Sequence, residues 1–199
     1  MKLKSALVGL MAMFAVCEAS ADSISTGVAS WLVNGNPAVI ETPIASPYWI
    51  SNFGDGKWVG TTSTDGSLSS GAAPGTYTFT LNLGPLGGIG TFDLQYAADN
   101  IVTWSITNGS LLGTTTCVGN PSLTDCFGSA AGAPRSLSGT FNVNSILTAT
   151  VINGTNSDRL NPMGLLVVGT ANVPVPTSLA LLALGGAALA ASGARRKTA

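Results

Sequence analysis

Few side chains in this sequence can carry out acid–base or metal chemistry, and histidine is not among them. The absence of histidine removes Ser-His-Asp and Cys-His catalysis and the usual zinc and copper ligands. Acid–base chemistry would then need two converging carboxylates, as in glycosidases. None of the acidic residues between positions 22 and 172 is adjacent to another. We therefore assign no catalytic residue and no metal ligand, and we expect a protein that is not an enzyme.

Two of the three cysteines, Cys117 and Cys126, flank a loop rich in Gly, Asn, Pro and Asp. The third, Cys17, lies in an N-terminal apolar stretch that an exported chain would lose with its signal peptide. The remaining even pair in such a loop predicts a disulfide. Closing a loop this short contributes about 2.5–3 kcal/mol on the chain-entropy model. A metal or redox site would need Cys-x-x-Cys spacing or histidine partners, and the sequence has neither.

Aromatic and polar residues gather in one Gly-rich stretch that contains Trp49, Asn52, Asp55 and Trp58. A sugar ring packs on an aromatic face while amide and carboxylate groups bind its hydroxyls. This stretch is our hypothesis for a weak carbohydrate-binding patch. The competing interpretation is a place in the core, because tryptophan in a sandwich is more often buried than exposed.

Aspartates in the expected turns suggest a structural calcium ion as a second hypothesis. Its candidate ligands are Asp65, Asp93, Asp99 and Asp158. Their spacing matches no known calcium loop, so solvated turn residues are the favoured interpretation and we expect no cofactor.

Short alternating segments separated by turn residues run through the middle of the chain. Tyr77–Leu83 places apolar residues on one face, as do Phe92–Tyr96 and Ile101–Thr107. Asn-Gly pairs at positions 34, 108 and 153 suit turns with positive φ. The further candidate strands are Ala29–Val33, Tyr48–Ser51, Trp58–Thr61, Leu111–Thr116, Leu137–Val143, Ile146–Ile152 and Met163–Gly169. We predict an all-β domain at residues 22–172, a β-sandwich or jelly roll of about 8–9 strands.

The N-terminus has the three parts of a secretory signal. Two lysines precede an apolar stretch, and the small residues Ala19-Ser20-Ala21 follow. We predict a signal peptide at residues 1–21 that signal peptidase cuts between Ala21 and Asp22. The general secretion machinery is therefore an expected partner.

The C-terminus combines prolines, one apolar span and a basic end. Val173-Pro174-Val175-Pro176 precedes the uncharged segment 177–194, and Arg195-Arg196-Lys197 follows it. The apolar segment has 18 residues, near the lower limit for a transmembrane helix. The basic residues would stay on the cytoplasmic side. Either a permanent membrane anchor or a removable one fits this pattern.

The tail at residues 173–199 resembles the sorting signals of PEP-CTERM proteins, the substrates of exosortases in Gram-negative bacteria. Those signals carry a Val-Pro-Glu-Pro core. Val175 stands where the glutamate usually lies, so the closer resemblance is to the related Val-Pro-Leu-Pro signals. The resemblance implies a precursor held in the inner membrane, cleavage by an exosortase-type enzyme near the prolines, and a mature form at the cell surface or in the extracellular matrix.

The order of segments in the body has a second resemblance, to exported bacterial domains of the galactose-binding-like β-sandwich type. It is carried by Pro74–Phe79, Ala97–Asn100 and Asn161–Val167. Residues 22–172 contain three basic and eight acidic residues, so we exclude nucleic-acid binding. We expect a structural or adhesive protein of the exopolysaccharide-rich biofilm matrix. The alternatives are a secreted carbohydrate-active enzyme that uses paired aspartates and a permanently anchored periplasmic domain.

Overall fold

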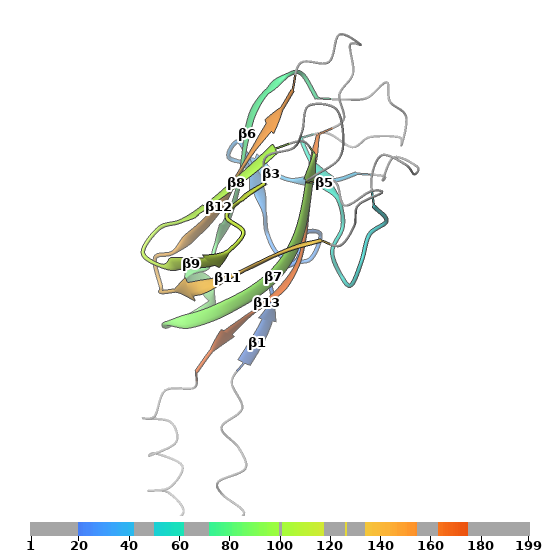
Figure 1. Cartoon of the computed structure of the whole chain (residues 1–199). Helices are drawn as coiled ribbons and strands as arrows, with labels where there is room; N and C mark the ends of the chain where they lie inside the picture. Colours follow the sequence, from blue (N-terminus) through green and yellow to red (C-terminus); the bar gives the residue numbers. More distant parts are fainter. Residues whose placement is uncertain are drawn as a thin grey trace, which may run out of the picture. The chain divides into compact units, whose positions relative to one another are not determined.

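Two antiparallel β-sheets dominate the described part of the chain (Figure 1). This computed structural model describes residues 20–41, 50–61, 72–99, 101–117, 126, 134–154 and 163–174. The first sheet has the strand order β4-β5-β13-β7-β11-β9, and β1 also pairs with β13. Its strands are β1 (Ser20–Ser23), β4 (Val39–Ile40), β5 (Val59–Gly60), β7 (Gly90–Asp99), β9 (Ser110–Gly113), β11 (Arg135–Phe141) and β13 (Gly164–Val173).

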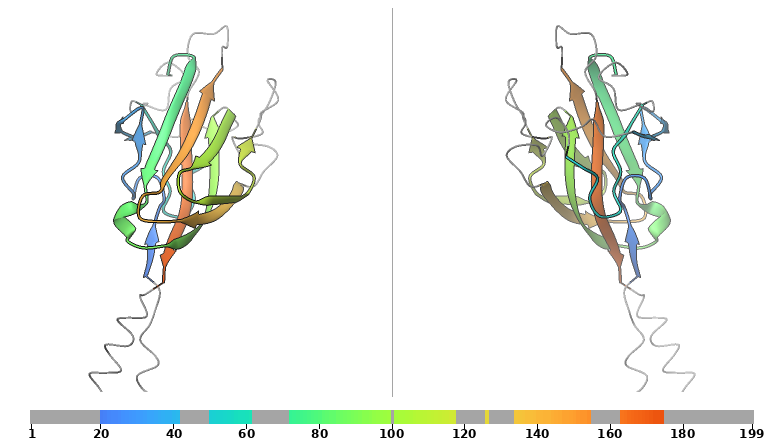
Figure 2. Two further views of the ribbon diagram at one scale, coloured as in Figure 1. Left: turned by 90° about the vertical axis from the view of Figure 1, so that its left-hand side faces the viewer. Right: turned by 90° about the vertical axis from the view of Figure 1, so that its right-hand side faces the viewer.

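The second sheet has the order β10-β8-β12-β6-β2-β3. Its strands are β2 (Leu32–Val33), β3 (Asn36–Pro37), β6 (Gly75–Asn82), β8 (Ile101–Ile106), β10 (Thr116–Cys117) and β12 (Ile146–Asn153), and a single 3₁₀ turn, η1 (Gly84–Leu86), follows β6. The two sheets pack face to face (Figure 2). The prediction of an all-β sandwich is confirmed.

The core between the sheets comes from alternating strand residues. Tyr96 of β7 meets Trp104 of β8 with ring centroids 5.1 Å apart, and Trp31 lies 6.2 Å from Trp104. Phe79 of β6 and Phe92 of β7 are also fully buried. Because side chains alternate across a strand, the predicted apolar faces of β6, β7 and β8 are confirmed.

Three predicted strands differ from the structure. Of the predicted strand Tyr48–Ser51, Ile50–Ser51 lies in a loop and the rest lies outside the described residues. Only Leu32–Val33 of the stretch Ala29–Val33 is a strand. The predicted strand Leu111–Thr116 is divided between β9 and β10, which belong to different sheets. The chain changes sheets after Gly113, whose φ of 101° breaks the extended backbone.

The turn predictions hold in part. Asn34 and Asn108 have φ values of 50° and 51°, as their Asn-Gly pairs predict. Asn153 instead ends β12 and is buried, where its amide donates hydrogen bonds to the carbonyls of Ala72 and Ala73 at 3.0 and 3.2 Å.

The chain divides into two compact units, Ala21–Asn172 and a second that joins Met1–Ser20 to Val173–Ala199. Most of the predicted signal peptide, the residues Val175 and Pro176, the segment 177–194 and the basic residues Arg195–Lys197 lie outside the described residues. Within the part of the chain that the structure describes, no helix is long and apolar enough to cross a membrane.

Candidate functional site

Trp58, the centre of the expected carbohydrate patch, is fully buried. It packs with Ala97 and Leu166 on the outer face of the first sheet, and the loop residues Ile50 and Phe53 cover this cluster. The indole N–H donates a hydrogen bond to the carbonyl of Ile50 at 2.9 Å. The ring therefore has no face open to a sugar, and Trp58 is a core residue of the loop that covers the sheet.

The other described members of that patch hold the same loop in place. The Asn52 side-chain carbonyl accepts a hydrogen bond from the Trp58 backbone N–H at 3.1 Å. The Asp55 carboxylate accepts hydrogen bonds from the hydroxyls of Ser23 and Ser25 at 2.7 and 2.6 Å, and these bonds lower its pKa. Trp49 lies outside the described residues. Asn52 and Trp58 are thus in contact, but as parts of a structural loop.

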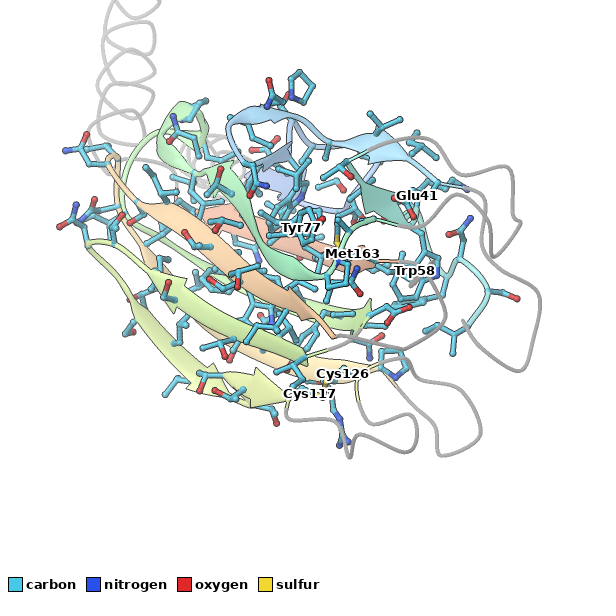
Figure 3. All side chains as sticks on the ribbon, turned by 90° about the horizontal axis from the view of Figure 1, so that it is seen from above. Glu41, Trp58, Tyr77, Cys117, Cys126 and Met163 are labelled. Carbon is cyan, nitrogen blue, oxygen red and sulfur yellow. A yellow bond between two sulfur atoms is a disulfide. The ribbon has the colours of Figure 1, made fainter. Side chains whose placement is uncertain are left out.

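Glu41 is a buried acid that the sequence did not single out. Glu41 is 3 % exposed, and burial raises its pKa to about 8. Its carboxyl oxygen Oε2 has no hydrogen-bond partner among the described residues. The carboxyl lies over Gly60, where a Cβ would collide with it and with the carbonyl of Met163. Figure 3 shows Glu41, Trp58 and Met163 gathered in one part of the body.

Asp99 is buried at the end of β7, in the same part of the first sheet as Glu41. Its strand partner is Gly164, next to Met163. Asp93 lies on the same strand, six residues away, and is exposed. Asp65 and Asp158, the other predicted calcium ligands, lie outside the described residues. Among the residues described, no group of three or more Cys, Asp or Glu side chains could hold a metal ion.

Cys117 and Cys126 form the predicted disulfide, with Cα atoms 5.8 Å apart (Figure 3). Cys117 ends β10 in the second sheet. The carbonyl of Cys126 accepts a hydrogen bond from the backbone N–H of Ala98 in the first sheet at 2.7 Å. The disulfide therefore ties the two sheets together near the end that Glu41 and Asp99 occupy.

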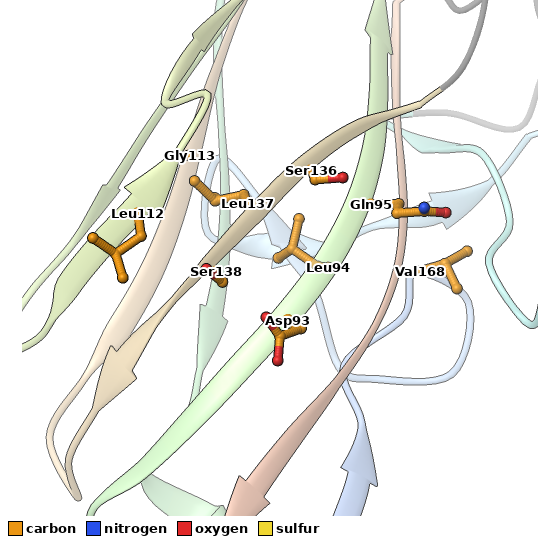
Figure 4. A pocket seen from close by; sticks show the side chains of 9 residues that line it. All are labelled: Asp93, Leu94, Gln95, Leu112, Gly113, Ser136, Leu137, Ser138 and Val168. Carbon is orange, nitrogen blue, oxygen red and sulfur yellow. The ribbon is translucent and has the colours of Figure 1, made fainter.

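A hollow of about 400 Å³ lies on the outer face of the first sheet, over the half that no described loop covers (Figure 4). The residues that line it come from four strands, and both polar and apolar residues are among them: Asp93, Leu94, Gln95, Leu112, Gly113, Ser136, Leu137, Ser138 and Val168. Alternation in β7 and β11 could have indicated that Asp93, Gln95, Ser136 and Ser138 face outward. The pairing that brings them together could not be read from the sequence.

The residues of the two predicted cleavage sites that the structure describes lie in paired strands. Ala21 and Asp22 are the middle residues of β1, and Val173 ends β13. Just after β1, the backbone N–H of Ile24 donates a hydrogen bond to the carbonyl of Gly169 in β13 at 3.0 Å.

Comparisons with family models, curated proteins and solved structures give no match. The resemblances of the tail and of the body therefore stay predictions, and the arguments below rest on the residues themselves.

Proposed function

We propose that this chain is an exported envelope protein. Its two terminal segments are sorting signals that are cleaved off, and its sandwich body is the mature protein. In this proposal a signal peptidase cuts after Ala21, and an exosortase-type enzyme cuts near Val173-Pro174-Val175-Pro176. The body then acts at the cell surface or in the extracellular matrix as a structural or adhesive protein.

The observation that carries the proposal is the burial of residues just inside each predicted cut. Ala21 is exposed, whereas Ile24 is 1 % exposed. At the other end, Ala171 is fully buried and Pro174 is exposed. Cutting at both places would leave every residue of the core in the product, as two disposable ends require.

Pairing of the terminal strands gives further support. Hydrogen bonds from the backbone N–H groups of Ile24 and Thr26 to the carbonyls of Gly169 and Val167, both 3.0 Å, join the first segment of the body to the last. All four residues lie inside the predicted cuts. The mature product would therefore keep these two hydrogen bonds, although the N-terminal cut falls inside β1.

Pro174 supports a cut just after β13. It has no backbone N–H to donate to a neighbouring strand, and it favours extended backbone in the residue before it. β13 ends at Val173. The chain after it would enter an extended-peptide cleft without breaking sheet hydrogen bonds.

The disulfide also favours export. Disulfides persist in oxidising compartments and are rare in the cytosol of mesophiles. The Cys117–Cys126 bond joins the end of β10 to Cys126, so an oxidised product is the form we expect outside the cytoplasm.

Intact-mass analysis of the mature protein tests this function. The full chain is expressed in a Gram-negative host that has an exosortase and in the isogenic strain without it. We expect a product that begins at Asp22 and lacks residues 177–199 in the first host, and a product that keeps them in the second. Replacing Arg195, Arg196 and Lys197 by glutamine should prevent this processing.

A matched change of Lys57 to glutamine in the body serves as the control and should leave both cuts unchanged. A product that keeps Leu179–Ala199 in the exosortase host would contradict the removable tail and favour a permanent anchor. Hydrolysis of a polysaccharide by the purified protein, abolished by one Asp→Asn change, would favour the enzymatic alternative.

A further inference from the structure

The hollow on the outer face of the first sheet is built from two rows of side chains that cross four strands. Strand pairing places Ser138 beside Asp93 and Leu112 beside Ser138. The second row contains Ser136, Gln95 and Val168. Neighbouring strands lie about 4.8 Å apart and residues two apart on one strand about 7 Å apart, so the rows present an ordered grid of polar groups (Figure 4).

The polar groups of this grid are available to a ligand. Within the described residues, the side chains of Asp93, Gln95, Ser136 and Ser138 make no hydrogen bond, ion pair or ring contact with the rest of the protein. By contrast, the Ser25 hydroxyl near the covering loop bonds to Asp55 at 2.6 Å. The grid therefore offers donors and acceptors that the fold does not use.

Charge and apolar surface narrow the class of ligand. Among the described residues, Asp93 is the only charged one that lines the hollow, and no cationic side chain lines it. A carboxylate without a cation repels acidic polymers and accepts hydrogen bonds from hydroxyls. Leu112, 65 % exposed, gives the C–H surface of a sugar an apolar contact. We propose that this hollow binds a strand of neutral, hydroxyl-rich polysaccharide.

A second copy of the chain fits the hollow less well. A two-fold contact through this face would bring the same surface of both copies together, and with it two Asp93 carboxylates. Removing like charges from water without cationic partners is unfavourable. A polysaccharide brings only neutral hydroxyls, which suit Asp93, Gln95 and the two serines.

This inference deepens the proposed matrix role and depends on it for its biological setting. Binding is measured on the purified full chain in detergent, so that tail processing does not enter the result. The probes are immobilised neutral glucans, mannans and galactans, with alginate as the acidic comparison. We expect retention on at least one class of neutral polysaccharide and none on alginate.

Two variants test whether the polysaccharide binds in the hollow. Ser136→Trp should fill it and weaken binding at least tenfold, and Gln95→Ala should weaken binding about three- to tenfold by removing a hydrogen bond. The matched control is Ser105→Trp, since Ser105 is an exposed strand serine on the second sheet. It should bind as the unmodified chain does. Asp93→Asn should allow binding to alginate.

Three outcomes would overturn the inference. The first is no retention on any neutral polysaccharide, and the second is an equal loss in Ser136→Trp and Ser105→Trp. The third is a self-associating chain that Ser136→Trp converts to a monomer without altering glycan binding. Thermal unfolding of each variant shows that it is folded, and Gln95→Ala remains informative if Ser136→Trp is not. A tail that is never cut would refute the proposed sorting and leave this test unaffected.

Discussion

The two halves of the first sheet share β7 and β13, but the outer face of one half is covered and that of the other is exposed. Along β7, buried and exposed residues alternate from Gly90 to Gln95, and then Tyr96–Asp99 are all buried. In β13 the first residues, Gly164–Val167, are all buried, whereas Val168–Thr170 are half-buried or exposed. Alternation marks a sheet with one solvated face, and continuous burial marks a sheet covered on both faces.

A loop covers the outer face of one of these halves. The loop through Phe53, Asp55 and Trp58 lies directly on β13. Gly56 makes this close approach feasible, because a Cβ there would collide with the carbonyl of Val167 and the side chain of Val168. We call this half the covered corner and the half that contains the hollow the open half. The packing in the covered corner stabilises the fold, whereas the open half leaves an exposed surface that contains the hollow.

Trp58→Ala should have the largest effect on this contrast. Removing a fully buried indole leaves a cavity in the covered corner, and such changes destabilise by about 3–5 kcal/mol. We expect a loss of that size in the free energy of unfolding, measured with denaturant. Gln95→Ala, in the open half, should change it by less than about 0.5 kcal/mol. Equal effects would show that the two halves do not differ as the burial indicates.

Much of the sandwich could be predicted from the sequence because its longer strands alternate. The segments around Phe79, Phe92 and Trp104 have the period of a strand, and each is one. Short strands such as β4 and β5 have only two residues, too few for a period to appear. Their existence depends on pairing with distant segments, which local pattern does not contain.

The candidate site was harder to predict, for two reasons. The local sequence around Trp58 would be the same for a tryptophan that binds a sugar and for one that lies in the core. Only its packing against Leu166 in the folded protein shows that it is a core residue. The hollow combines residues from β7, β9, β11 and β13, and their register is set by the fold as a whole. Cys117 and Cys126 were predictable because they are close in sequence and their loop has few ways to close.

Glu41 should make stability fall as the pH rises. Its pKa is about 8 in the folded protein, against an ordinary value of 4.5. Between these values the folded state holds a proton that the unfolded state has lost, so stability declines with rising pH by at most about 1.4 kcal/mol per unit. Below 4.5 and above 8 this decline stops. The expected total is a few kcal/mol.

Glu41→Gln should remove that decline, since glutamine does not ionise, and should leave the chain more stable than the unmodified one at pH 8. The free energy of unfolding, measured with denaturant at several values between pH 5 and pH 8, gives the slope for each chain. Asp93→Asn, in the open half, is the control and should leave the slope unchanged. A slope that persists in Glu41→Gln would assign the pH dependence to another group.

Loss of the disulfide should have the next largest effect. A Cys117→Ser, Cys126→Ser double variant frees a loop whose closure contributes about 2.5–3 kcal/mol on the chain-entropy model. Because Cys126 also bonds to Ala98, amide hydrogen exchange should rise first near the end of β7. Uniform exchange changes over both halves would show that the bond does not act on the covered corner in particular.

Asp55→Ala tests the smallest contribution to stability, the hydrogen bonds that hold the covering loop to the N-terminal segment. The Asp55 carboxylate accepts hydrogen bonds from Ser23 and Ser25, but it is exposed, so we expect a loss of only about 0.5–1 kcal/mol. Those bonds lower its pKa, so its contribution is present above the ordinary value of 3.8 and is lost as the pH falls through the lower folded value. The difference between Asp55→Ala and the unmodified chain should therefore shrink in acid. The control is Asp93→Ala, which removes an exposed acid of the open half. Its free energy of unfolding should equal that of the unmodified chain at neutral and at acid pH. A loss equal to that of Asp55→Ala would mean that net charge, and not the hydrogen bonds to Ser23 and Ser25, sets the effect.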